Sequence, residues 1–237
     1  APVAAVKSDD YSALAIAAQT VDELLADLAS GKTTSEKATQ AYLDRIAKVD
    51  DAGPMLNAVI VTNPNALKSA ADSDAARKAG KARPLEGVPI LIKDNIETLD
   101  PMPTTAGSLA LKLNLAGRDA PVVARLRAAG AVILGKTNLS EWANFRSDFS
   151  SSGWSGVGGL TKNPFVLDRN ACGSSSGTGS GVAAGLAAAG VGTETDGSIV
   201  CPASTNGLVG LKPTVGLVPR THIVPISASQ DTAGPMT

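Results

Sequence analysis

Hydrophobic positions near the start of the chain recur with helical spacing. Between residues 38 and 49 apolar side chains return every three to four positions, which predicts a helix with one apolar face. Capping-box patterns at "TVDE" (20–23) and "TTSE" (33–36) predict two helix starts. A helical segment over about residues 10–50 is therefore expected to open the chain.

Beyond this segment, short β-branched runs alternate with helix-like stretches. The runs are "LNAVIV" (56–61), "VPILI" (88–92), "AVIL" (131–134) and "VGTET" (191–195). The stretches between them are "NALKSAADSDAARKAG", "APVVARLRAAG" and "SGVAAGLAAAG". Continuous apolar strands alternating with helices predict an α/β fold, with a mostly parallel or mixed central sheet covered by helices on both faces. We expect a single domain over residues 1–237, with its core from about 55 to 237.

The two ends of the sequence suggest a partial chain. "SQDTAGPMT" at the C-terminus shows no pattern of a closing helix or strand, so we expect the sheet to be incomplete there. The first residue is Ala1 rather than Met, which fits a processed or trimmed end. An exported, periplasmic protein and a cytoplasmic one both stay open.

Composition narrows the range of ligands. The chain is 43% hydrophobic with a net charge of −1 and no basic stripe, so neither nucleic acid nor an anionic membrane is an expected partner. No apolar run is long enough to span a bilayer. A single histidine and two cysteines, Cys172 and Cys201, cannot supply the usual ligands of a structural zinc site, so no metal is expected. No cofactor is implied either. Both cysteines are predicted to be small buried thiols.

The segment 173–181, "GSSSGTGSG", permits more than one chemistry. Gly179, Gly181 and Ala184 fit the G-x-G-x-x-A pattern of a phosphate-binding loop. No convincing strand leads into this pattern, and the lysine of the alternative P-loop form is missing. Phosphate binding is therefore disfavoured.

A nucleophile elbow is the second interpretation of the same segment. Residues 173–177 fit G-x-S-x-G around Ser175, and Asp196 and His222 follow in the order found in α/β-hydrolases. The missing strand weakens this interpretation as well.

Lys93 suggests a third chemistry. It follows the most apolar predicted strand of the chain, "PILI". Burial at such a position lowers the pKa of a lysine, so that it can accept a proton near neutral pH and activate a serine. The alternative is an ordinary strand-end lysine whose ammonium lies in water.

Three stretches together resemble the amidase signature family: "GVPILIKDN", "GSSSGTGSGVAAGLAAAGVGTETDGSI" and "NGLVGLKPTVG". The wider pattern "GKTNLSEWANFRS…SSSGWS…CGSSSG…TETDGSIVCPAS" is similar to the bacterial peptide amidases of that family, which remove ammonia from C-terminally amidated peptides. Other members act on fatty acid amides, malonamate and glutaminyl-tRNA precursors. The likeness runs from about residue 20 to the end, and members are longer, so the chain resembles an N-terminal half.

The resemblance implies a Ser-Ser-Lys triad. Ser198 in "DGSI" would be the nucleophile, Lys93 in "KDN" the base, and Ser174 the serine that bridges them. The peptide bond between Gly173 and Ser174 would be cis. Hydrolysis of the amide would pass through an acyl-enzyme on Ser198 and release ammonia.

The resemblance also implies an oxyanion hole formed by the backbone N–H groups of Thr195, Asp196, Gly197 and Ser198. Most members carry a glycine where this chain has Asp196. A carboxylate so close to an oxyanion would repel it, so Asp196 is expected to point away, towards Arg220 or towards polar groups of a peptide.

Substrate contacts are less defined. Trp142, Phe145 and Arg146 are candidates for a peptide groove, with core packing or loop anchoring as the alternative. Ser175 is a candidate for substrate binding or for tuning Lys93, and a loop hydroxyl that satisfies backbone groups is the alternative.

The expected ligand is a small amide or a C-terminally amidated peptide, and the oligomeric state stays open. Two other functions remain beside peptide amide hydrolysis. One is a non-catalytic binding or inhibitory fragment that keeps an amidase scaffold, and the other is the A-type component of a glutamyl-tRNA amidotransferase.

Overall fold

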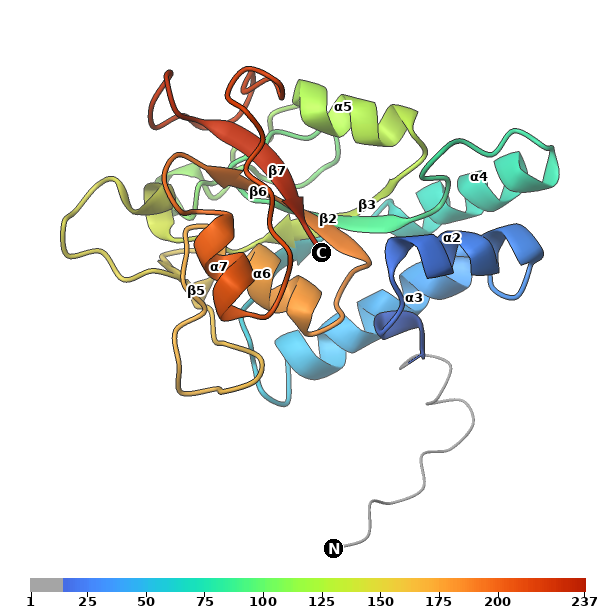
Figure 1. The fold of residues 1–237 in the computed structure, drawn as a ribbon, viewed down its shortest axis with the longest axis horizontal. Helices are drawn as coiled ribbons and strands as arrows, with labels where there is room; N and C mark the ends of the chain where they lie inside the picture. The colour runs from blue at the N-terminus through green and yellow to red at the C-terminus, as the bar shows by residue number, and fades with distance from the viewer. Residues whose placement is uncertain (1–14) are drawn as a thin grey trace, which may run out of the picture.

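A computed structural model describes residues 15–237 (Figure 1). Ala1 and residues 10–14 of the predicted helical segment lie outside the described part. The centre of the fold is a five-stranded sheet in the order β1-β3-β2-β6-β7. The strands are β1 (Val59–Thr62), β2 (Pro89–Lys93), β3 (Val132–Thr137), β6 (Ala189–Glu194) and β7 (Thr232–Met236).

The sheet is mixed, as predicted. β2 pairs in parallel with both β3 and β6, whereas β1 and β7 pair antiparallel at the two edges. β4 (Trp154–Ser155) and β5 (Gly159–Leu160) form a separate antiparallel pair. The four predicted strands are confirmed, with β6 beginning two residues before the predicted start.

Helices cover both faces of the sheet (Figure 1). α5 (Pro121–Ala128) lies over one face, and α6 (Ser176–Ala183) and α3 (Ser35–Arg45) lie over the other. The remaining helices are α2 (Val21–Ser30), α4 (Ala66–Lys78) and α7 (Val200–Thr205), with a π-helical turn at η1 (Ile46–Asp50) and 3₁₀ turns at η2 (Leu109–Leu111) and η3 (Glu141–Asn144).

The first predicted capping box is confirmed and the second is displaced. At α2 the Thr20 hydroxyl accepts the Glu23 N–H, and the Glu23 carboxylate accepts the Thr20 N–H. At α3 the cap is Thr34, one residue later than predicted. The reason is a distant side chain: the Asp74 carboxylate on α4 accepts the free N–H groups of Ser35 and Glu36.

The predicted helix over "SGVAAGLAAAG" is shifted along the chain. α6 begins at Ser176 and ends at Ala183, followed by Gly185 with a left-handed φ of 68°. Its glycines allow a close approach to the sheet, because a Cβ at Gly177 would overlap the Ala58 carbonyl oxygen. Gly179 and Gly181 lie inside this packed helix, so the phosphate-loop interpretation is wrong.

The expectation that no strand closes the chain is also wrong. Residues 232–236 form β7, antiparallel to β6. Pro235 cannot donate to a ladder, and the sequence "TAGPM" lacks an alternating pattern, so the strand gave no local signal. The strand forms because β6 offers a free edge with which it pairs. On the side of β7 away from β6, the Leu211 N–H donates to the Pro235 carbonyl.

Candidate active site

Lys93 ends β2 with its side chain turned towards α6. Side chains alternate across a strand, so Lys93 and its neighbour Thr137 share the face on which Thr137 contacts Thr178 of α6. The Lys93 ammonium lies 2.7 Å from Ser174 Oγ and 2.9 Å from Thr193 Oγ1, and the residue is completely buried. The alternative in which its head lies in water is wrong.

The electrostatics of Lys93 suit a base. Burial removes water from the ammonium and lowers the Lys93 pKa to about 7, although the carboxylates of Glu194 and Asp231 act in the opposite direction. An appreciable fraction of the side chain is therefore neutral at physiological pH. The Asn95 side-chain amide donates a hydrogen bond to the same Thr193 hydroxyl, with 2.9 Å between Nδ2 and Oγ1.

A second buried lysine, Lys136, lies on the face of the sheet opposite to that of Lys93 and α6. Lys136 on β3 donates to the Ile96 carbonyl and to Thr104 Oγ1, and Asp94 lies 3.9 Å away. Burial lowers the Lys136 pKa to about 8. Because it faces away from Ser174, Lys136 does not belong to the same cluster.

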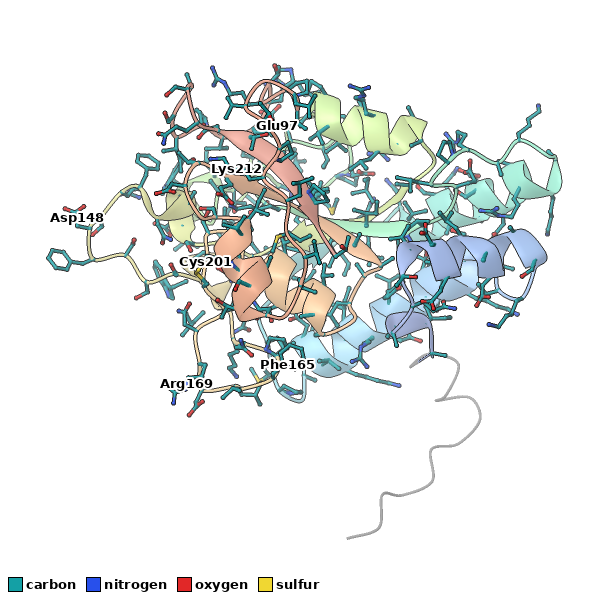
Figure 2. The ribbon with its side chains drawn as sticks, viewed as in Figure 1. Glu97, Asp148, Phe165, Arg169, Cys201 and Lys212 are labelled. Atoms are coloured by element: carbon teal, nitrogen blue, oxygen red, sulfur yellow. A yellow bond between two sulfur atoms is a disulfide. The ribbon has the colours of Figure 1, made fainter. Side chains whose placement is uncertain are left out.

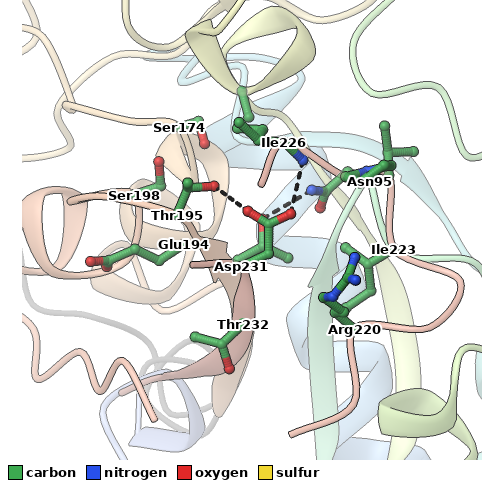
Figure 3. Close-up of a pocket in the computed structure, with 14 residues that line it drawn as sticks. Asn95, Ser174, Glu194, Thr195, Ser198, Arg220, Ile223, Ile226, Asp231 and Thr232 are labelled. Atoms are coloured by element: carbon green, nitrogen blue, oxygen red, sulfur yellow. Dashed lines mark hydrogen bonds between the residues drawn. The ribbon is translucent and has the colours of Figure 1, made fainter. Parts of the chain in front are cut away.

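Ser174 and Ser198 come from distant segments and line one pocket (Figure 3). The Gly173–Ser174 peptide bond is cis, as the resemblance implied. Ser175 N–H donates 3.1 Å to the Ser198 carbonyl, which ties the two segments together. Ser174 is fully buried and Ser198 is 7% exposed. In this structure, which describes both residues, their hydroxyls form no direct hydrogen bond.

The pocket at these serines is small, with a volume of about 20 Å³, enough for one or two water molecules. Residues from the segment after the "GLKPTVG" motif form much of its wall. The lining residues are Asn95, Ala143, Ser174, Thr193, Glu194, Thr195, Ser198, Arg220, Ile223, Val224, Pro225, Ile226, Asp231 and Thr232.

Glu194 organises the backbone around Ser198. Its buried carboxylate is turned away from Asp231 (Figure 3) and accepts the N–H groups of Gly197, Ile199 and Val200 at 2.8, 2.7 and 2.9 Å. The Gly197 N–H is therefore engaged and does not face a substrate. The N–H groups of Asp196 and Ser198 have no partner among the described residues. Of the predicted oxyanion-hole donors, these two therefore stay available, whereas Gly197 N–H does not.

Two further charged residues hold Thr195. The Asp231 carboxylate accepts the Thr195 hydroxyl at 2.6 Å (Figure 3), together with the N–H groups of Ile226 and Ser227. On the backbone side, the Lys212 ammonium donates to the Thr195 carbonyl. Sequence reasoning missed Glu194, Asp231 and Lys212, although Lys212 lies in the quoted "GLKPTVG" motif.

Asp196 is exposed, in agreement with the expectation that it points away from the site. The suggested contact with Arg220 is not formed among the described residues. Arg220 lines the pocket instead.

The elbow-type triad is not assembled. Ser175 is buried, with its hydroxyl donating to the Thr193 carbonyl at 3.1 Å and accepting the Thr193 N–H at 3.2 Å. His222 lies 3.7 Å from Glu97 rather than beside Asp196. Both hydrogen bonds of the Ser175 hydroxyl serve the backbone of β6, and a substrate role for Ser175 stays a prediction.

The aromatic candidates lie outside the pocket of Ser198. Phe145 is 57% exposed, and Arg146 lies 3.5 Å from Glu141 at a separate open hollow of about 490 Å³. Trp142 lines neither hollow, and of residues 142–146 only Ala143 reaches the wall beside Ser198. A substrate role for Trp142, Phe145 and Arg146 stays a prediction.

The two cysteines form a disulfide, so the prediction of free buried thiols is wrong. Their Cα atoms lie 6.0 Å apart, within the range a disulfide spans. Cys172 precedes Ser174 by two residues, and Cys201 on α7 follows Ser198 by three (Figure 2). The bond therefore fastens the two serine segments to each other.

Residues 15–237 contain neither a metal-binding cluster nor a membrane-spanning helix. No cluster of histidine, cysteine, aspartate and glutamate side chains there is arranged to hold a metal ion. No helix in that part of the chain combines the length and apolar character needed to cross a membrane.

Comparisons with known proteins agree with this geometry. Peptide amidase from Stenotrophomonas maltophilia is 58% identical and superimposes with a TM-score of 0.90, over 92% of this chain and 45% of that one. A probable amidase of Arabidopsis thaliana is 48% identical over 95% of this chain and 44% of its own length. The A-type component of the glutamyl-tRNA(Gln) amidotransferase of Thermobifida fusca is 47% identical over 90% of this chain and 42% of its own length.

The chain thus spans less than half the length of these relatives. The sequence profile of the amidase family matches residues 37–237, a region that contains Lys93, Ser174 and Ser198. The chain belongs to the amidase family.

Proposed function

We propose that this chain carries the catalytic centre of an amidase that hydrolyses a carboxamide C–N bond, with Ser198 as nucleophile, Ser174 as bridge and Lys93 as base. The observation that carries the proposal is the buried Lys93 ammonium, 2.7 Å from the Oγ of Ser174, which lines the same pocket as Ser198. No other buried lysine in residues 15–237 contacts a serine hydroxyl.

The reaction follows from this arrangement. Neutral Lys93 takes the proton of Ser174, which takes the proton of Ser198 as the Ser198 oxygen bonds to the amide carbonyl carbon. The C–N bond then breaks, and the proton returns along the same path to the leaving nitrogen, which departs as ammonia. Water attacks the resulting ester by the same route, giving the carboxylic acid and free Ser198.

The substrate class we favour is the C-terminal amide of peptides. Support comes from the peptide amidase of Stenotrophomonas maltophilia, which is 58% identical to this chain, whereas the glutamyl-tRNA(Gln) amidotransferase component is 47% identical. An amidotransferase function is the second candidate, because that relative is also 47% identical over 90% of this chain. Ammonia release from free glutamine in place of an amidated peptide would favour it.

The proposal is tested by ammonia release from a C-terminally amidated dipeptide. The parent chain should release ammonia, and Ser198→Ala should release none above background. Ser30→Ala is the matched control, because Ser30 lies exposed at the end of α2 and should leave the rate unchanged. Equal rates in Ser198→Ala and the parent would refute the nucleophile, and an inactive parent would favour a non-catalytic role.

His222→Ala should change the rate of ammonia release by less than about twofold. The imidazole lies 3.7 Å from Glu97, and His222 is not among the residues that line the pocket of Ser198 and Ser174. A steady-state comparison with the parent at pH 8 checks this. Loss of activity in His222→Ala would contradict the proposal and favour the nucleophile-elbow triad of Ser175, Asp196 and His222.

A further inference from the structure

Lys212 lacks the partner that a half-buried ammonium normally has. No carboxylate forms an ion pair with it among residues 15–237, and its one recorded acceptor is the Thr195 carbonyl oxygen. It lies beside the end of the β6–β7 pair (Figure 2), where Leu211 is fixed by its bond to the Pro235 carbonyl. The positive charge of Lys212 therefore lies against a peptide carbonyl and not against a carboxylate.

The peptide group concerned is the one that joins Thr195 to Asp196. The Gly173–Ser174 bond is the one cis peptide in the described chain, so the Thr195–Asp196 bond is trans. In a planar trans peptide the C=O and the N–H point in opposite directions. Fixing the Thr195 carbonyl on Lys212 therefore fixes the Asp196 N–H on the opposite side, where it has no partner in the described residues.

A charge on the carbonyl also strengthens that donor. Hydrogen bonds along a peptide polarise one another, so an ammonium on the oxygen makes the N–H at the other end more positive. The Thr195 hydroxyl is held at 2.6 Å by Asp231, which prevents the residue from rotating about this contact. The Gly197 N–H donates to Glu194, so it is not available to an oxyanion, and stabilisation of the oxyanion depends more on the Asp196 N–H.

We propose that Lys212 is a positioning residue for the reaction, which orients and polarises the Thr195–Asp196 peptide so that the Asp196 N–H stabilises the oxyanion formed during amide hydrolysis. The inference rests on the proposed function for its chemistry. Its structural part, the influence of Lys212 on one peptide group, can be measured without turnover.

The sequence offers a direct probe of this peptide group. Thr195–Asp196 is the only Thr-Asp dipeptide in the chain. Protein labelled with carbonyl carbon-13 threonine and nitrogen-15 aspartate therefore gives a single carbonyl-linked amide signal, that of Asp196. Lys212→Met should move its nitrogen resonance to lower frequency, and Lys212→Arg, which keeps a cationic donor, should return it towards the parent value.

Lys162→Met is the matched control. Lys162 is also partly buried and also donates its ammonium to a backbone carbonyl, that of Pro54 at 2.8 Å, but it does not line the Ser198 pocket. It should leave the Asp196 signal in place. An unchanged Asp196 signal in Lys212→Met would overturn the inference.

Kinetics provide the second readout. Lys212→Met should lower kcat for the amidated dipeptide on the order of tenfold with little change in KM, less than the 10²- to 10³-fold lost when an oxyanion donor is removed outright. Lys212→Arg should recover most of it. A rise in KM at constant kcat, or a fall matched by loss of folded protein, would overturn a positioning role. An inactive parent would refute the proposed function, while the Asp196 signal would still decide the effect of Lys212.

Discussion

Lys93→Met is expected to lower kcat/KM for amide hydrolysis by about 10³-fold, because a positioned base contributes roughly 10²- to 10⁴-fold and Lys93, which contacts Ser174, is the proposed base. Methionine matches the length of lysine and needs no hydration, so the variant should stay folded. Steady-state ammonia release and thermal unfolding measure the two effects separately. Lys68→Met, at an exposed position on α4, is the control.

The pH dependence of the parent should identify the same group. Burial lowers the pKa of Lys93 to about 7, so the neutral amine that can accept a proton increases as pH rises through this value. The logarithm of kcat/KM should therefore rise with pH below about 7 and level off above it. A rate that falls over pH 6–8 would contradict a neutral lysine base.

The same shift has a consequence for stability. An unfolded lysine keeps its proton up to about pH 10.4, whereas folded Lys93 loses it near pH 7. The unfolded state thus binds more protons between these values, and the free energy of unfolding gains a contribution from Lys93 that rises with pH across this window. Lys93→Met should reduce that rise in urea unfolding series between pH 7 and 9.

Reduction of the Cys172–Cys201 bond should lower the free energy of unfolding by about 3 to 4 kcal/mol, since the bond closes a loop with a sequence separation of 29 residues. The cross-link restricts the unfolded chain, and reduction removes that restriction. Urea unfolding of the parent with and without reductant gives the difference.

The double variant Cys172→Ala, Cys201→Ala is the control for that experiment. It holds no cysteine, so reductant should leave its unfolding midpoint unchanged. Its midpoint should match that of the reduced parent. Equal midpoints for the oxidised and reduced parent would contradict a stabilising bond.

Local signals predicted the elements that surround the site but not every boundary. The Thr20 capping box and the apolar run before Lys93 depend on residues close in sequence, and both are confirmed. The start of α3 depends on Asp74, and β7 depends on the free edge of β6. Neither of these partners is visible to a pattern of neighbouring residues.

The candidate site divides in the same way. Lys93, Ser174 and Ser198 were selected from motifs, and the structure brings Lys93 into contact with Ser174 beside Ser198. Glu194 and Asp231 were missed, because a carboxylate that binds backbone N–H groups three or more residues away has no composition signal. The disulfide was missed because its two cysteines become neighbours only after α6 and α7 pack together.

The most direct measurement is the identity of the reactive serine. The chain is treated with a peptidyl fluorophosphonate, which bonds to an activated serine oxygen with loss of fluoride, and the adduct is located by mass spectrometry of proteolytic fragments. The account predicts one adduct, on Ser198, that is absent from Ser198→Ala and forms far more slowly in Lys93→Met. An adduct on Ser175, or equal labelling of Lys93→Met and the parent, would contradict it.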